Sequence, residues 1–159
     1  MIVVNIFGVP GTQKSKFISS TYSTLACNDV DCGIVGDFNV DLNKNMFMLL
    51  GSIVDRFDEY KHKDVIVTNT PLLLQPVYYR QNDLPVPDMF EILVYQLFQK
   101  YTNVNILVED PNNSYIYRDI KEMFAKYDIP YELVTSIQDA TYAVILSTLV
   151  SKLKGGWNA

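Results

Sequence analysis

Short apolar runs alternate along this chain with longer segments in which apolar residues recur every three to four positions. The runs predict buried strands, and the longer segments predict amphipathic helices. Strands are predicted at Ile2–Phe7, Asp64–Thr68, Val104–Val108 and Tyr131–Val134, with Gly33–Val35 as a weaker fifth. Helices are predicted at Lys14–Leu25, Leu42–Tyr60, Met89–Tyr101, Tyr115–Tyr127 and Ile137–Leu153. This alternation predicts an α/β fold with a mostly parallel five-stranded sheet flanked by helices.

Two aspartates refine the helix boundaries. Asp88, which follows Pro85 and Pro87, is predicted to cap the helix at Met89–Tyr101. Asp139 is predicted to cap a shorter version of the last helix. The four stronger runs are rich in Val, Ile and Leu rather than alternating, so we expect these four strands to be central and buried on both faces.

Length and composition fit one domain. The chain has 159 residues, of which 48% are hydrophobic and 19% charged, and this is enough apolar material for a single core. We predict one domain over residues 1–153 and a fraying tail over residues 154–159. No apolar stretch approaches the ~20 residues of a membrane span, and the first residues do not resemble a signal peptide. We therefore expect a cytoplasmic protein without a membrane partner.

Charge and residue counts exclude several classes of site. The net charge is −5 and the pI ≈ 4.7, so no nucleic-acid partner is expected, because such binding needs clustered Lys and Arg. Cys27 and Cys32 are too few for a disulfide framework or a zinc site. The single histidine, His62, excludes a His-based triad and a multi-His metal site. The spacing of the acidic residues over 29–41 does not fit a calcium loop.

One segment carries a specific chemical motif. Gly8-Val-Pro-Gly11-Thr-Gln13-Lys14-Ser15 joins the first predicted strand to the first predicted helix, the context in which a phosphate-binding loop aims backbone amides at an anion. In the standard pattern two glycines bracket four residues, a lysine reaches the phosphates and a hydroxyl binds Mg²⁺. Gly8, Lys14 and Ser15 match. Gln13 replaces the second glycine, at an expected cost of about 1 kcal/mol.

A second polar segment, Thr68-Asn69-Thr70-Pro71, follows the strand predicted at Asp64–Thr68. In an open α/β sheet the carboxyl end of such a strand faces the ligand crevice. A carboxylate there would act as a base or hold hydrated Mg²⁺, whereas the Asn69 amide has neither basicity nor charge. The alternative is that this segment only ends a strand and starts a helix.

Together these segments resemble the NadR-like nucleoside and nucleotide kinases of the P-loop superfamily, particularly small phage-encoded, ATPase-like members. The likeness covers most of the chain and lies in GVPGTQKSKF, DVIVTNTPLLLQPVYY, YTNVNILVED and the helix that ends in YDIPYELV. It implies a three-layer P-loop NTPase fold of the nucleotide-kinase type. It also implies ATP and Mg²⁺ as cofactors if the loop is functional, and none otherwise. The nucleotide would contact Gly8, Gly11, Thr12, Gln13, Lys14, Ser15 and Asn69, with Ser15 also binding the metal.

Departures from the family pattern cluster around one pocket. Gln13 replaces a loop glycine, Asn69 replaces an acidic residue, and Glu109 stands where an arginine would face the phosphates. The family's glycine-arginine lid is shortened here to Asn112–Tyr117. Phosphoryl transfer depends on positioning and on neutralising charge with Mg²⁺, Lys and Arg, so these losses predict a degenerate kinase.

Three hypotheses stay open. The first is a degenerate kinase-like protein with weak or no phosphoryl transfer, which binds a nucleotide-like ligand or a protein partner and, if phage-encoded, works in the host cytoplasm. The second is an active kinase or ATPase with relocated groups. Its catalytic candidates are Lys14, Asp37 and Arg118, with Asp41, Asp110 and Lys16 as further ones. The third is a ligand-free interaction protein or homo-oligomer, which the eleven tyrosines suggest.

Overall fold

The computed structural model describes residues 1–36 and 43–155. It contains five strands and six helices in the described residues, in the order β1 (Ile2–Phe7), α1 (Lys14–Cys27), β2 (Cys32–Val35), α2 (Met46–Asp58), β3 (Val65–Thr68), α3 (Leu74–Gln81), α4 (Asp88–Phe98), β4 (Thr102–Val108), α5 (Tyr115–Lys126), β5 (Glu132–Val134) and α6 (Ala140–Gly155). Four predicted strands match to within two residues at each end, and the weaker one at Gly33–Val35 is also present. The α/β fold class is therefore confirmed.

All the strands of the sheet run parallel, in the order β2-β3-β1-β4-β5. The central strand β1 pairs with β3, Asn5 opposite Thr68, and with β4, Phe7 opposite Leu107. Because the chain first builds the sheet on one side of β1 and then on the other, the switch in strand order falls beside β1. In such sheets ligands bind at this switch point, outside the carboxyl ends of the strands.

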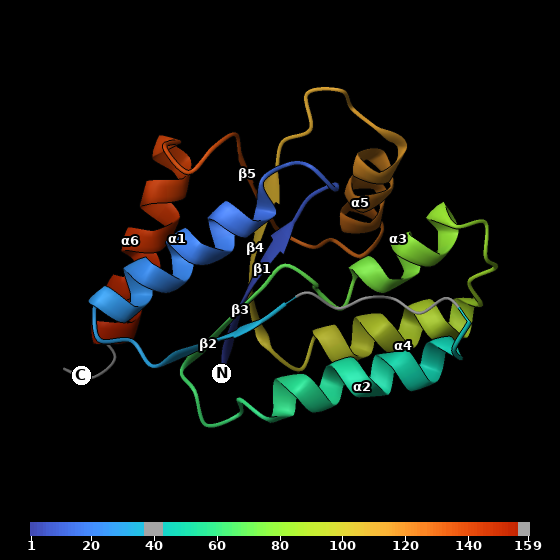
Figure 1. The fold of residues 1–159 in the computed structure, drawn as a ribbon, viewed down its shortest axis with the longest axis horizontal. Coiled ribbons are helices and arrows are strands. Elements are labelled where there is room, and N and C mark those ends of the chain that lie inside the picture. The colour runs from blue at the N-terminus through green and yellow to red at the C-terminus, as the bar shows by residue number, and fades with distance from the viewer. Residues whose placement is uncertain (37–42, 156–159) are drawn as a thin grey trace.

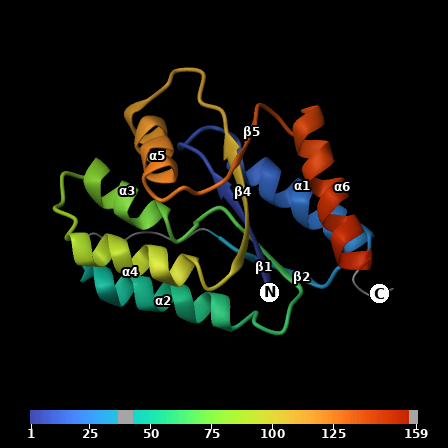
Figure 2. The same cartoon turned by 180° about the vertical axis from the view of Figure 1, so that it is seen from behind.

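The helices cover both faces of the sheet and complete three layers. Figures 1 and 2 show α1 and α6 on one face, and α2, α3, α4 and α5 on the other. The core on the α1 side includes Phe17 and Tyr142, whose rings meet edge-on at 5.1 Å. The core on the other side includes Phe7 and Phe124, whose rings meet edge-on at 4.8 Å. Burying each such side chain stabilises the fold by roughly 1.5–3 kcal/mol.

The expectation that the four stronger runs form central strands is wrong for β5. This strand lies at the edge of the sheet, and Glu132 and Leu133 are exposed. Among the described strands this edge strand pairs only with β4, and only Val134 of its three residues is buried. Its short length also limits unwanted pairing with other chains.

Of the two predicted caps, one is confirmed and one is wrong. The Asp139 carboxylate accepts hydrogen bonds from the amides of Thr141 and Thr135, both at 2.9 Å, immediately before α6. Asp88 is instead the first residue of α4, and Pro87 holds the capping position. Pro87 already has the extended backbone of a cap, so the Asp88 carboxylate falls in the first turn, where the helix dipole favours negative charge.

Helix α3 was not among the predicted helices, although the alternative for Thr68–Pro71 includes a helix start after this segment. Within the described ranges, no helix has both the length and the apolar character needed to cross a membrane.

Candidate functional site

The loop that follows β1 folds into a compact turn. The amide and the hydroxyl of Thr12 both donate to the carbonyl of Val9, at 3.2 and 2.6 Å. A Cβ atom on Gly8 would lie 2.7 Å from the Thr12 hydroxyl oxygen, so this position requires glycine. The first amides of an α-helix have no partner inside the helix, and the loop directs those of α1 toward the carboxyl end of the sheet.

Two residues of this loop have left-handed backbones. Gly11 has φ of 88° and Gln13 has φ of 61°. Glycine adopts this region readily, but a glutamine there is strained by about 1 kcal/mol. The loop therefore adopts a positive φ at residue 13 even though glutamine is less stable than glycine in this conformation.

We expect Gln13→Gly to leave the free energy of unfolding unchanged or slightly higher, because relief of the strain offsets the extra freedom of glycine in the unfolded chain. Gln13→Val should lower it by about 1 kcal/mol or more, because a β-branched residue tolerates positive φ poorly. Urea unfolding of both variants checks this. Equal stabilities of the Gly and Val variants would contradict the strained loop.

Lys14 occupies the first turn of α1 and reaches across to α3. Its Nζ donates to the Tyr78 hydroxyl at 3.4 Å, a long and weak hydrogen bond. Burial lowers the pKa of Lys14. No carboxylate forms an ion pair with it within residues 1–36 and 43–155. A partly buried ammonium whose hydrogen-bond partner is neutral is poised to bind an anion.

Asn69 lies next to this loop, because β1 and β3 are neighbours and their carboxyl ends meet at one edge of the sheet. Its Oδ1 is buried and has no hydrogen-bond partner among residues 1–36 and 43–155. A Cβ on Gly36 would lie 2.9 Å from that oxygen, so a larger residue after β2 would displace the Asn69 amide. An orphaned amide oxygen and the exposed Ser15 hydroxyl are neutral oxygen ligands of the kind Mg²⁺ accepts, and they would need a ligand's phosphates to supply the charge.

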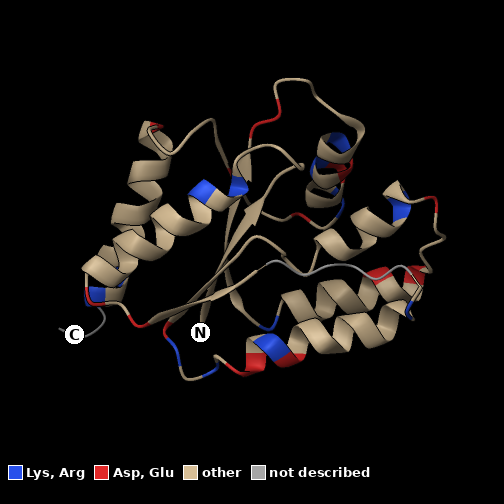
Figure 3. Ribbon diagram, viewed as in Figure 1, with Lys and Arg blue, Asp and Glu red and all other residues tan. Residues whose placement is uncertain are grey.

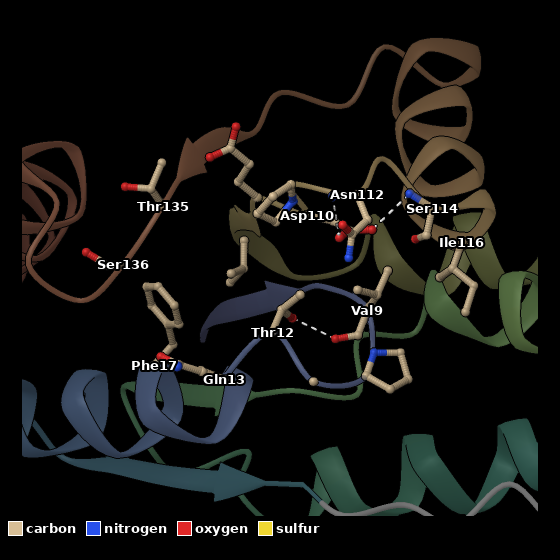
Figure 4. A pocket seen from close by; sticks show the side chains of 15 residues that line it. Val9, Thr12, Gln13, Phe17, Asp110, Asn112, Ser114, Ile116, Thr135 and Ser136 are labelled. Atoms are coloured by element: carbon tan, nitrogen blue, oxygen red, sulfur yellow. Dashed lines mark hydrogen bonds between the residues drawn. The ribbon is translucent and has the colours of Figure 1, made fainter.

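A cavity of about 670 Å³ opens above the loop, between the carboxyl ends of β4 and β5. Figure 4 shows its walls: Val9, Thr12 and Gln13 on one side, Thr135 and Ser136 on another, and Asp110, Asn112 and Ser114 facing them. A volume of 300–1,000 Å³ is typical of small-molecule sites.

Asp110 shapes one wall of this cavity. Its carboxylate accepts hydrogen bonds from the amides of Asn112, at 3.1 Å, and Ser114, at 2.9 Å. Hydrogen bonds from Ser114, and then from the amide of Asn112, lower the pKa of Asp110 below its ordinary 3.8. The carboxylate is therefore committed to holding the turn before α5.

This commitment predicts a pH dependence. Because the folded pKa lies below the unfolded one, the stabilisation is fully present above about pH 4–5 and is lost as the pH falls through the folded pKa. We expect the free energy of unfolding of the wild type to fall more steeply than that of Asp110→Asn on acidification, measured by urea unfolding from about pH 5 to pH 2. Asp64→Asn, which changes an exposed aspartate, is the control. Parallel curves for wild type and Asp110→Asn would contradict the assignment.

The structure places the remaining predicted residues as follows. Ser15 and Lys16 are exposed at the start of α1. Arg118 is exposed on α5, its guanidinium 5.9 Å from the centre of the Tyr115 ring, and does not line the cavity. Asp37 and Asp41 lie outside the described residues. In the described part of the chain, no three His, Cys, Asp or Glu residues are grouped so as to hold a metal ion.

No model of a protein family matches the chain, and no curated protein matches it. Solved structures do match. Thymidylate kinase from Ehrlichia chaffeensis superposes with a TM-score of 0.54 at 10% identity, covering 96% of this chain and 98% of that one. The chain has the fold of the P-loop nucleotide kinases.

Two further structures share this P-loop kinase-like fold. Deoxyadenosine kinase from M. mycoides, solved with bound dATP, has a TM-score of 0.51 at 14% identity over 99% of this chain and 100% of that one. A de novo designed P-loop protein has a TM-score of 0.50 at 9% identity, covering 97% and 95%. Identities this low establish the fold, so the ligand of this chain must be argued from its own residues.

Sequence reasoning missed Tyr78 and the cavity residues Thr135 and Ser136. Tyr78 lies on α3, and no helical periodicity in the sequence marked this segment. Thr135 and Ser136 directly follow β5, and the rule that ligands bind at the carboxyl ends of parallel strands points to them.

Proposed function

We propose that this protein binds a nucleotide-like ligand at Gly8–Ser15 and the adjoining cavity, with weak or no phosphoryl transfer. The observation that carries the proposal is the partly buried Lys14 ammonium beside the phosphate-loop turn, whose one partner among the described residues is the neutral Tyr78 hydroxyl. Lys14 and the amides of the loop would bind phosphate oxygens, and the Ser15 hydroxyl would contribute to Mg²⁺ binding.

Weak catalysis is proposed because the groups that accelerate phosphoryl transfer are sparse. Asn69 supplies no charge at the end of β3, and the Arg118 guanidinium lies over the Tyr115 ring and does not line the cavity. Losing an arginine that stabilises the transition state costs several orders of magnitude in rate.

The narrower likeness to NadR-like kinases, the phage origin and the cytoplasmic location stay predictions of the sequence.

A thermal-shift panel with ATP, GTP, nucleosides and Mg²⁺ tests the proposal. A ligand at 100 times its dissociation constant should stabilise the protein by about 2.7 kcal/mol. Nucleotides should shift the melting temperature, and nucleosides, which lack phosphates, should shift it less. An unchanged melting temperature with every nucleotide at millimolar concentration would contradict the proposal.

A second candidate function is self-association, which exposed apolar residues on α2 and α4 favour. These two helices lie side by side, with the rings of Phe47 and Phe90 5.3 Å apart, and Met48 and Met89 are 71% and 77% exposed (Figure 1). Clustered apolar exposure of this kind marks protein interfaces. Light scattering tests it: a dimer that Met48→Glu disrupts would support it, and a monomer at high concentration would exclude it.

A further inference from the structure

The cavity beside the phosphate loop is acidic. Its two charged lining residues are Glu109 and Asp110, and no Lys, Arg or His is among the described residues that line it. In Figure 3 basic residues mark the start of α1, whereas the segment after β4 is acidic. Lys14 lies on the other side of the loop, toward Tyr78. Phosphates therefore fit the Lys14 side, and the cavity suits a neutral group that donates hydrogen bonds.

Most polar side chains of the cavity are already engaged. The hydroxyls of Thr12 and Thr135 donate to the Val9 carbonyl and to the Asp139 carboxylate, at 2.6 and 3.0 Å. The Ser136 hydroxyl accepts from the Gln138 amide at 3.2 Å, and Asp110 holds the following turn. These groups line the cavity, but their hydrogen bonds hold the protein itself together.

Glu109 is different. Its amide donates to the Val134 carbonyl at 2.8 Å, which fixes its backbone to the end of β5. Its side chain is exposed and accepts no hydrogen bond and makes no ion pair within the described part of the chain. Burial and then the negative charge of Glu109 raise the pKa of Tyr117 on α5.

The other free polar side chains of the cavity, Gln13 and Asn112, are amides that both donate and accept, so they do not discriminate between ligands. An ionised carboxylate only accepts, and it accepts best from two adjacent donors. Among the nucleobases, guanine presents such a pair, its N1–H and its 2-amino group. Adenine and cytosine each offer one amino group, and hypoxanthine keeps N1–H but lacks the 2-amino group.

We infer that Glu109 makes the cavity selective for a guanine nucleotide, with its carboxylate accepting hydrogen bonds from the N1–H and 2-amino groups of the base. This inference rests on the proposed nucleotide site and names the ligand class of that site. Glu109 is thus a specificity-determining residue, held at the cavity wall by the hydrogen bond from its amide to the end of β5.

Calorimetric titration of the full chain with GDP, IDP and ADP in the presence of Mg²⁺ tests it. GDP should bind about tenfold or more tightly than IDP, which differs by the 2-amino group alone, because a hydrogen bond to a charged group is worth at least that factor. Glu109→Gln should weaken both nucleotides but GDP more than IDP, because GDP loses two charge-assisted hydrogen bonds and IDP, which keeps only N1–H, loses one. The preference for GDP over IDP should therefore shrink. Glu122→Gln, an exposed change on α5 outside the cavity, should keep the wild-type preference.

The outcomes separate the two proposals. Binding of GDP, IDP and ADP within a factor of two of one another would overturn the role of Glu109 and leave the nucleotide site standing. A GDP preference that survives undiminished in Glu109→Gln would overturn it as well. Absence of binding with all three nucleotides would overturn both proposals.

Discussion

Replacing Lys14 with methionine is expected to weaken nucleotide binding by about 10- to 100-fold, because a hydrogen bond to a charged group contributes about 1.5–3 kcal/mol. The same change should leave the free energy of unfolding of the ligand-free protein unchanged or higher, because it removes a partly buried ammonium that no carboxylate of the described residues compensates. Calorimetric titration and urea unfolding of the same preparation measure the two effects.

Lys16→Met is the matched control, since Lys16 lies two residues away on the same helix and is exposed. Lys16→Met should change neither the affinity for the nucleotide nor the free energy of unfolding by much. Equal losses of affinity in the two variants would show a diffuse electrostatic contribution and contradict the role of Lys14.

The pH dependence of stability adds a check. Because the folded pKa of Lys14 is lowered, the free energy of unfolding of wild type should rise relative to that of Lys14→Met as the pH rises toward 10.5.

Arg80→Ala is expected to lower the free energy of unfolding by about 3 kcal/mol. The guanidinium of this α3 residue binds both carboxylate oxygens of Asp119 on α5, at 3.0 and 2.9 Å, and lies 3.7 Å from Glu91 on α4. The two carboxylates are only 12% and 11% exposed. Removing one partner of a buried ion pair leaves the other charge uncompensated, and such losses reach about 3–5 kcal/mol.

Arg80→Lys separates charge from geometry. Lysine keeps the charge but cannot make the bidentate contact, so its loss should lie between those of wild type and Arg80→Ala. Pairing Arg80→Met with Asp119→Asn should recover part of the stability, because it removes both charges of the pair. Urea unfolding measures all four proteins. A loss below about 1 kcal/mol for Arg80→Ala would show that this contact is an ordinary surface ion pair.

Local signals predicted the buried parts of the fold. The apolar runs at β1, β3 and β4 are dictated by burial on both faces, and the three-to-four spacing along α4 and α5 reflects one buried side of a helix. Local signals did not predict the features that depend on contacts between segments distant in the sequence. The edge position of β5 and the formation of α3 across Pro76 depend on neighbours that are distant in the sequence.

The candidate site was predictable in the same uneven way. The Gly8–Ser15 loop is one continuous segment, so its motif and the strain at Gln13 were visible from the sequence, and the positive φ of Gln13 confirms the expected strain. The cavity joins the ends of β1, β4 and β5, and only the order of the strands brings Glu109 and Thr135 to the loop. The sequence marked Glu109 only as the residue that stands where an arginine is expected. Its proposed role as a hydrogen-bond acceptor rests on the structure, in which most polar side chains around it already have partners.

The most direct test of the central claim measures binding and turnover in one sample. Purified protein is titrated with a nucleoside triphosphate and Mg²⁺ by calorimetry, and the same mixture is assayed for released phosphate and phosphorylated nucleosides. We predict saturable binding at one site per chain, lost in Lys14→Met, with product formation at or near background. Absence of binding, or an ordinary kinase rate that Lys14→Met abolishes, would contradict the account.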